Sequence, residues 1–517
     1  MRDPLLFAFG VHNHQPVGNF PEVVARAHRR AYAPFLATLH RYPGVSFSLH
    51  LSGSLWEWLD ENAPDTVELI RELAARGQCE LLAGTYYESL APVAPAGDVR
   101  DSIMTYADTL AAAFGARPRG MWLAERVYEP HLPELLAAAG VEYTAVDDWH
   151  FRAAGIDAGR LDRPWLAEHQ GAVVALCPIS QRLRYLVPFA PPEEVLAHFR
   201  ELYDAGALMT CLADDGEKFG EWPRTYEHCY RDGWLERFLA LVEENRTWLR
   251  PATLGEAVAT IPAAGPAYLP ATSYYEMTRW AMPAAAQRRL AELGDDFASE
   301  GVAGDLAPGA SFRSFFHKYP EVNFFHKRVQ EVSRRASAAD LAPEIRSRLQ
   351  RHLWRAQAND AYWHGVFGGC YLPHLRRGVK EELVRAEALL DRHLGTTEGE
   401  EIRDVDADGG VDVTLKNDRL VAVLKAAEGL AAAELSRRSP PAVLTDVAPR
   451  RAERYHAEMG QEDEGAVETI HAPRADKEAG LERHLAYDRR PRRWFLDPLF
   501  AGEATVATYA AEEAEEW

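Results

Sequence analysis

Short apolar runs alternate with amphipathic stretches over about the first 260 residues, and this alternation limits the fold more than any other feature of the sequence. Seven apolar runs predict β-strands: Leu5–Val11, Val45–His50, Cys79–Ala83, Gly120–Leu123, Tyr143–Val146, Ala172–Cys177 and Ala207–Leu212. The stretches between them predict helices. Strands that alternate with helices usually lie parallel in one sheet, so we expect a distorted (β/α)7 barrel. A doubly wound open sheet is the alternative, because strand order is invisible in a sequence.

The pattern changes twice after the predicted barrel. Residues 271–395 predict a mostly helical region, which we expect to pack on the barrel and to complete its site. Residues 396–517 contain short β-type runs between charged segments. A chain of 517 residues is long enough for several cores. We therefore expect a barrel over 1–270, a helical region over 271–395 and a β-rich domain over 396–517.

Charge and cysteine content restrict the partners. Acidic residues outnumber basic ones by 78 to 57, and this field repels nucleic acid and anionic lipid but not a neutral sugar. The five cysteines are widely spaced without a C-x-x-C pair, which fits reduced thiols. No cleavage site follows the first apolar run, and no run is long enough to span a bilayer. We expect a cytoplasmic protein without nucleic-acid or membrane partners; whether it forms a homo-oligomer is left open.

Ionisable residues lie in or directly after four of the predicted strands. They are His12 and His14, Glu80, Glu125, and Asp214 and Asp215. Active sites of parallel barrels form at the C-terminal ends of the strands, so these groups are expected to converge there. Each one alone is also explained as a solvated loop position. Glu125 departs from that explanation, because it follows an apolar strand and lies near Trp122, where a pocket wall can partly desolvate a carboxylate.

The segment Asp214–Pro223 holds a second group of carboxylates. Asp214, Asp215 and Glu217 lie within four residues, and their mutual repulsion raises the pKa of at least one of them. A general acid needs such a raised pKa near neutral pH. An acidic turn with Lys218 as counter-ion, or a magnesium site, explains the same spacing.

Two further segments, Ser273–Trp280 and Asn359–Gly365, interleave aromatic and polar residues. Sugar rings stack on aromatic planes while carboxylates and amides bind their hydroxyl groups, so Trp280, Asp360 and Trp363 are candidate sugar-binding residues. Aromatic residues in helical segments are also common core residues.

Five blocks carry a family resemblance: His12–Pro16, Gly77–Glu80, Trp122–Arg126, Asp214–Gly220 and Asn359–Gly365. In this order the sequence resembles glycoside hydrolase family 57, in particular its branch of 4-α-glucanotransferases and α-amylases, from residue 3 to about residue 445. The resemblance implies a retaining 4-α-glucanotransferase that acts on α-1,4-glucans (maltodextrin, amylose, starch) through a covalent glycosyl-enzyme. Hydrolysis of the same bonds by an α-amylase is the alternative. No cofactor or metal is implied.

The resemblance also assigns roles on a distorted barrel of seven strands. Glu125 matches the nucleophile and Asp215 the general acid/base. The substrate-binding candidates are His12, His14, Glu80, Trp122, Glu217, Trp280, Asp360 and Trp363. The C-terminal part matches the start of a β-sandwich that continues further in the family, so we expect a reduced or incomplete sandwich here.

Two other classes stay open from the residues alone. His12, His14 and Asp214 could ligate zinc in a metal-dependent carbohydrate deacetylase. A non-catalytic glucan-binding protein would bind starch without cleaving it. The run Asp404–Gly409 resembles the first half of a calcium loop, but no glutamate follows at the twelfth position, so a plain acidic turn is expected.

Overall fold

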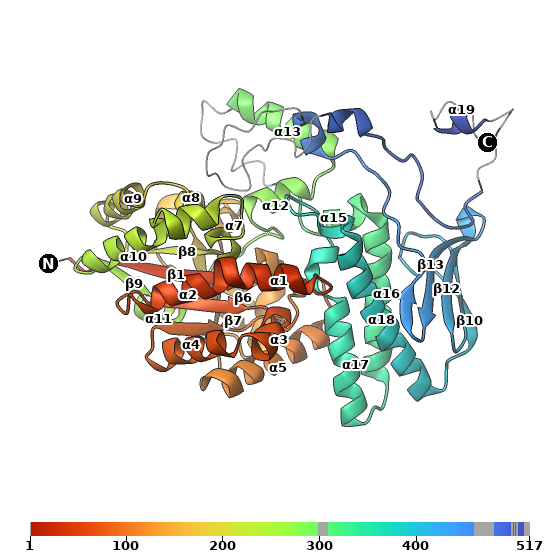
Figure 1. Ribbon diagram of the computed structural model, residues 1–517, viewed down its shortest axis with the longest axis horizontal. Coiled ribbons are helices and arrows are strands. Elements are labelled where there is room, and N and C mark those ends of the chain that lie inside the picture. The colour runs from red at the N-terminus through yellow and green to blue at the C-terminus, as the bar shows by residue number, and fades with distance from the viewer. Residues whose placement is uncertain are drawn as a thin grey trace.

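The computed structural model describes residues 2–297, 309–459, 480–497, 500, 502 and 505–510. Figure 1 shows three layers along its long axis: a sheet wrapped by helices, a group of long helices, and a smaller sheet. The N-terminus lies at the far end of the first part. None of the helices among these residues has the length and apolarity to cross a membrane.

The first sheet is a ring of seven parallel strands in the order β3-β2-β1-β8-β7-β5-β4. Their bounds are β1 Leu5–Asn13, β2 Phe47–Leu51, β3 Cys79–Leu82, β4 Gly120–Met121, β5 Tyr143–Asp147, β7 Ala172–Ile179 and β8 Met209–Asp215. A parallel bridge between Ala83 and Met121 joins the two outer members and closes the ring. The predicted (β/α)7 barrel is therefore confirmed, and the open sheet is excluded.

The barrel is distorted at two places. Strand β7 meets β8 in register only at Ile179 and Cys211. Two strands that the sequence pattern missed also join the sheet: β6 (Trp165–His169) runs antiparallel to β7, and β9 (Leu249–Ala252) runs parallel to β1.

Helices cover the outside of the barrel. They are α1 Pro21–Ala27, α2 Ala33–His40, α3 Gly53–Asn62, α4 Pro64–Ala75, α5 Ala96–Phe114, α6 Leu132–Ala138, α7 Asp148–Arg152, α8 Gln181–Leu186, α9 Pro192–Ala205 and α10 Trp234–Glu244. Strand β1 shows why: Leu5, Phe7 and Phe9 are fully buried against these helices. Its other side carries the smaller Leu6 and Ala8, which cluster with helix α11 (Leu254–Thr260).

The helical region follows. Its bounds are α12 Tyr275–Trp280, α13 Ala284–Phe297, α15 Ser314–Lys318, α16 Pro320–Ala338, α17 Pro343–Ala356 and α18 Pro373–Leu394. Helix α17 packs against α5 of the barrel and against α18. Proline at the first turn of α16, α17 and α18 fits a helix start, where the missing N–H leaves no partner unsatisfied.

The second sheet has five antiparallel strands in chain order. They are β10 Gly399–Arg403, β11 Asp412–Lys416, β12 Leu420–Lys425, β13 Ala431–Arg438 and β14 Pro441–Val443. Its edge strand β14 and the adjacent β13 pack on helix α18 (Figure 1). Within the described part of the chain this β-rich region is one sheet backed by a helix, in place of the two sheets of a sandwich.

Ion pairs fasten this sheet to the helices. Asp391 of α18 meets Arg438 Nη2 at 2.6 Å and Lys416 Nζ at 3.1 Å, and Arg335 of α16 also contacts it. Arg328 of α16 donates to Glu434 of β13 at 3.0 Å. Because these charges are buried, each needs its partners to remain stable.

The acidic turn before β11 surrounds the ammonium group of a lysine side chain, Lys425. Lys425 Nζ lies 2.7 Å from Asp406 Oδ1, 3.0 Å from Asp408 Oδ2 and 3.1 Å from Asp412 Oδ1. The ammonium group neutralises carboxylates that a calcium ion would need, so a plain acidic turn remains the expectation.

Candidate active site

The C-terminal ends of β1, β2 and β8 bring three ionisable residues to one level. His12 is in register with Asp215 of β8 and with His50 of β2. All three side chains are largely buried at the end of the barrel where parallel barrels carry their active sites. The convergence expected from the sequence is therefore present for His12 and Asp215.

Glu125 follows β4 in a strained turn. Its φ is +51° and that of Arg126 is +46°, a region that costs a side chain on the order of 1–3 kcal/mol. Neighbours hold the turn: the Ser273 hydroxyl donates to the backbone oxygen of Glu125, and His150 Nε2 donates to that of Arg126 at 2.8 Å. The Tyr274 hydroxyl donates to Glu125 Oε2 at 2.8 Å, which fixes the carboxyl group.

Burial sets the proton affinity of Glu125. Desolvation, aided by the charge of Asp215, raises the pKa of this carboxyl to about 7, against the opposing effects of Arg126 and of the Tyr274 hydrogen bond. The guanidinium of Arg126 stacks over the Tyr274 ring at 4.3 Å. Glu125 is thus a carboxyl that exchanges its proton near neutral pH.

The adjacent aspartates lie in opposite electrostatic surroundings. Asp214 contacts Lys218 Nζ at 2.8 Å, Arg184 Nε at 3.5 Å and Arg126 Nη1 at 3.7 Å. Although burial works against it, these three cations hold the pKa of Asp214 well below its usual range. Burial and the charge of Asp214 instead raise the pKa of Asp215. Asp214 is therefore a permanent anion, whereas Asp215 can carry a proton.

Glu217 and His14 join the barrel to the helical region. Oε1 of Glu217 accepts the backbone N–H of His14 at 2.9 Å and also the Tyr32 hydroxyl. Burial, with the charge of Asp215, raises the pKa of Glu217 to about 7. His14 Nε2 donates to Oδ1 of Asp360 at 3.0 Å, and despite burial this carboxylate and Glu88 raise the pKa of His14 to about 10. The imidazole is thus a cation paired with Asp360.

Aromatic rings surround these groups. His12 stacks on Trp122 with ring centroids 4.6 Å apart. Trp280 stacks on Trp363 at 6.0 Å, and Tyr274 meets Trp280 edge-on at 5.9 Å. Because Tyr274 also holds Glu125, the pair of tryptophans adjoins the carboxyl group, as a sugar-stacking surface requires.

The structure does not bring Glu80 to this group. In the sheet register Leu82, and not Glu80, stands level with His50. Oε2 of Glu80 accepts the Ser48 hydroxyl at 2.6 Å and the N–H of Gly255 at 3.0 Å, and Tyr143 donates to Oε1. This carboxylate binds the start of α11 inside the barrel, next to Thr253, whose hydroxyl caps the helix by accepting the N–H of Glu256.

Two residues that the sequence reasoning missed belong to the group. His50 Nδ1 lies 2.9 Å from His12 Nδ1, and Glu88 Oε1 lies 3.4 Å from His50 Nδ1. Burial, with the charges of Glu125, Asp360 and Asp215, raises the pKa of Glu88 to about 8. His50 ends a predicted strand and could have been found by that position. Glu88 lies nine residues beyond the start of β3, in a loop without a signal.

The zinc ligands of a deacetylase are not assembled from the expected residues. Asp214 is held by three cations and His14 by Asp360, so neither is available beside His12. These contacts argue against the His12–His14–Asp214 ligand set.

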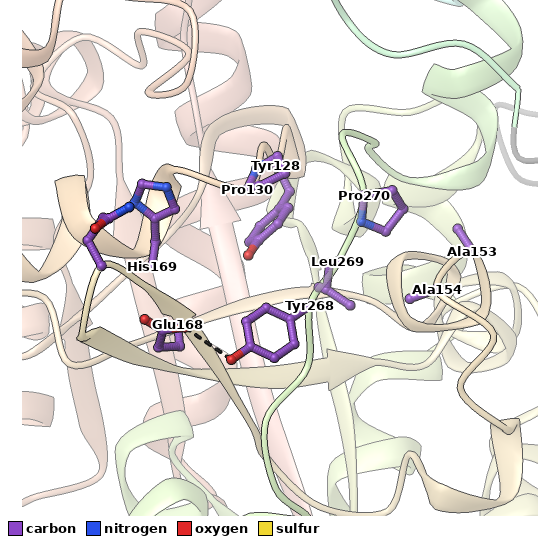
Figure 2. Close-up of a pocket in the computed structure, with 10 residues that line it drawn as sticks. Tyr128, Pro130, Ala153, Ala154, Glu168, His169, Tyr268, Leu269 and Pro270 are labelled. Carbon is purple, nitrogen blue, oxygen red and sulfur yellow. Dashed lines mark hydrogen bonds between the residues drawn. The ribbon is translucent and has the colours of Figure 1, made fainter.

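A separate pocket of about 670 Å³ lies on the flank of the barrel (Figure 2). Its walls come from the β6–β7 turn, the end of α7 and the segment before α12; Tyr268 donates to Glu168 Oε2 at 3.1 Å there. None of the candidate catalytic residues lines it. The chemistry is therefore expected at the strand ends rather than in this pocket.

A closed barrel that gathers partly buried carboxyl groups of raised pKa, a paired histidine and stacked tryptophans at its strand ends defines a class: an enzyme of the glycoside-hydrolase type. The sequence profile of Glycosyl hydrolase family 57 matches residues 8–270. Profiles for the middle and C-terminal domains of Alpha-amylase/4-alpha-glucanotransferase match residues 310–390 and 404–517. The chain belongs to glycosyl hydrolase family 57.

Curated relatives span nearly the whole chain. A 4-alpha-glucanotransferase of Thermococcus litoralis is 38% identical over 97% of this chain and 75% of its own length. An alpha-amylase of Pyrococcus furiosus is 36% identical over 100% of this chain and 78% of its own. The crystal structure of the 4-alpha-glucanotransferase from Thermococcus litoralis superposes with a TM-score of 0.88 at 36% identity, covering 100% of this chain and 76% of that one.

Proposed function

We propose that this chain is a retaining 4-α-glucanotransferase that acts on α-1,4-glucans such as maltodextrin, amylose and starch. The observation that carries the proposal is the pair of partly buried carboxyl groups at one barrel mouth, Glu125 after β4 and Asp215 at the end of β8. The similarity to 4-alpha-glucanotransferases of two Thermococcus species supports it.

The neighbours of Glu125 and Asp215 assign different roles to these two carboxyl groups. Arg126 and the Tyr274 hydroxyl favour the charged form of Glu125, as a nucleophile requires. The permanent charge of Asp214 favours the protonated form of Asp215, as a general acid requires. The reaction starts from the state in which Glu125 is charged and Asp215 carries the proton.

The reaction then proceeds in two displacements. Asp215 gives its proton to the oxygen between two glucose units while Glu125 attacks the anomeric carbon, which leaves a glycosyl group on Glu125. Asp215, now charged, takes the proton of an acceptor hydroxyl as that oxygen displaces Glu125. When the acceptor is the 4-hydroxyl of another glucan the result is transfer, and when it is water the result is hydrolysis.

Binding of the sugar is assigned to the surrounding groups. The charged pair of His14 and Asp360, together with Glu217 and His12, offers donors and acceptors for glucose hydroxyls. Trp122, Trp280 and Trp363 offer ring faces. Trp280 is the more exposed partner of its stacked pair, so we place the acceptor glucan on that side. We also place the enzyme in the cytoplasm, because its five cysteines are buried and unpaired.

α-Amylase activity is the second candidate, because several relatives of 36–37% identity carry that name. Incubation with maltoheptaose alone separates the two. Transfer gives longer and shorter malto-oligosaccharides from the first minutes with few new reducing ends. If only shorter products form and reducing ends rise in step with substrate loss, the enzyme is an amylase.

Glu125→Ala tests the site itself. We expect a loss of more than about a thousandfold in turnover, roughly 4 kcal/mol in activation free energy, with folding preserved. Azide should restore turnover and appear as a glycosyl azide, since a small anion fits the space of the lost carboxylate. Glu134→Ala, at an exposed position on α6, is the matched control and should keep full activity. Retained activity in Glu125→Ala would refute the assignment.

A further inference from the structure

Three buried side chains at the barrel mouth bring their ligand atoms together. His12 Nδ1 and His50 Nδ1 are 2.9 Å apart, His50 Nδ1 and Glu88 Oε1 are 3.4 Å apart, and Glu88 Oε1 and His12 Nδ1 are 3.7 Å apart. They come from β1, from β2 and from the loop after β3. The exposed fraction of these residues is 5% for His12, 0% for His50 and 2% for Glu88.

The triangle has the dimensions of a metal site. Ligands at about 2.0–2.1 Å from a tetrahedral zinc ion stand roughly 3.3–3.4 Å from one another. The three measured edges lie on either side of that value. Two imidazoles and one carboxylate are a common donor set for zinc, with a fourth position left for water or another ligand.

An unpartnered oxygen of this triad points to a ligand that the protein itself does not supply. Glu88 Oε2 is buried without a hydrogen-bond partner, whereas buried polar atoms are normally paired. His50 Nε2, on the side of the ring away from Nδ1, is also unpartnered and can take a hydrogen that leaves Nδ1. The strained backbone of Glu88, with φ at +59°, holds its side chain in this position. Asn359 fixes that turn by donating from its side chain to the backbone oxygen of Glu88 at 2.9 Å.

We propose that His12, His50 and Glu88 form an inhibitory site for a divalent transition metal, zinc above all. The two Nδ1 atoms share one hydrogen in the metal-free protein. The ion takes both lone pairs, so that hydrogen moves to Nε2 of the same ring by way of solvent, and any proton on Glu88 is released. Metal binding therefore weakens as the pH falls.

Inhibition is the expected consequence, and this part alone rests on the proposed function. His12, one of the three proposed ligands, is in register with Asp215 on the adjacent strand β8. A divalent cation bound to His12 stabilises the carboxylate form of Asp215, which then cannot protonate the leaving oxygen. Reduced turnover that returns when a chelator is added is the result to look for.

Binding is tested without reference to activity. The full-length protein is stripped with chelator and titrated with Co²⁺, whose visible absorption reports a tetrahedral site. We expect one such ion per chain in the wild type. Glu88→Gln, which keeps the shape of the side chain, and His50→Gln should lose at least about tenfold in affinity. His169→Gln removes an exposed histidine–glutamate pair outside the barrel mouth and should bind as the wild type does.

The outcomes are separable. If wild type shows no tetrahedral Co²⁺ spectrum, or if Glu88→Gln binds equally well while folded by circular dichroism, the metal site is wrong. If Co²⁺ binds as expected but Zn²⁺ does not slow maltoheptaose turnover, the site stands and its inhibitory role is wrong. Absence of any turnover by metal-free wild type would contradict the proposed function and leave the spectroscopic result intact.

Discussion

Tyr274 donates the hydrogen bond that holds Oε2 of Glu125, and its removal should alter the pH dependence of the enzyme. The bond stabilises the charged carboxylate and so lowers the pKa of Glu125. In Tyr274→Phe that pKa rises, and less of the nucleophile is charged at any pH below it. We expect the acid limb of the kcat/KM profile to move to higher pH, with a several-fold loss at pH 6.

Tyr87→Phe provides the matched control. Tyr87 donates to Glu57 at 2.6 Å in a tyrosine–carboxylate pair that includes no candidate catalytic residue. Its acid limb should coincide with that of the wild type. An unchanged limb in Tyr274→Phe would show that Glu125 is not the group that titrates on that side.

Substitution of the two adjacent aspartates, Asp214 and Asp215, should have different effects. Asp215→Asn is expected to lower turnover of natural glucans by about 10²–10⁴-fold, and to spare the first step with an aryl glycoside whose leaving group needs no proton. Asp214→Asn leaves Lys218 buried without its anion and removes one of the anions of Arg126 and Arg184, which keep Asp147. We expect this variant to lose roughly 3–5 kcal/mol of unfolding free energy.

Urea unfolding and a comparison of leaving groups separate these outcomes. Asp215→Asn should unfold close to the wild-type midpoint. A stable Asp214→Asn whose defect depends on the leaving group would transfer the acid role to Asp214.

The turn between β8 and the segment after it depends on one small residue. A Cβ at Gly216 would collide with the side-chain oxygen of Asn13 and come within 2.9 Å of Val11 Cγ1. Gly216→Ala therefore pushes the turn away from β1 and displaces Asp215 and Glu217. A shift of about 1 Å in such a site costs on the order of a hundredfold in rate, which kcat measurement will show.

Gly97→Ala is the control for that variant. Gly97 lies in α5, and a Cβ there meets no atom within 4 Å. Its activity and stability should equal or slightly exceed those of the wild type, because alanine favours a helix. Wild-type activity in Gly216→Ala would mean that the turn relaxes without moving the carboxyl groups.

The barrel strands were predictable because a buried parallel strand needs a short, mainly apolar run, and each of the seven lies on one. Strands β6 and β9 were not predictable, because the runs at Trp165–His169 and Leu249–Ala252 mix polar and apolar residues and depend on neighbours for pairing.

Asp215 and Glu125 could be predicted as site residues because each follows a predicted strand. Glu88 could not, because its place depends on contact with Asn359, far away in sequence. Glu80 was expected at the strand ends because it is a carboxylate in a predicted strand. Its position within that strand instead directs it toward α11.

At the scale of the whole molecule, Asp391 joins the small sheet to the helical region. It meets Arg335, Lys416 and Arg438, which come from α16, β11 and β13. Asp391→Asn keeps a hydrogen-bond acceptor but removes the charge, so Lys416 loses its anion and Arg335 and Arg438 keep only the longer contact with Glu387. We expect a loss of about 3–5 kcal/mol in unfolding free energy, measured in urea. Asp418→Asn, exposed on the β11–β12 turn, should cost nothing, and an equal cost in both would refute this role.

The bond between His14 and Asp360 spans 346 residues and has a consequence for synthesis. A chain that grows from its N-terminus on the ribosome has all its barrel strands available once Ala252 has emerged. The imidazole of His14 then lacks Asp360, and the loop that carries Glu88 lacks Asn359, until the helical region has been made. Partly synthesised chains therefore cannot process glucan, and folding of the barrel mouth is completed late, when the helical region docks.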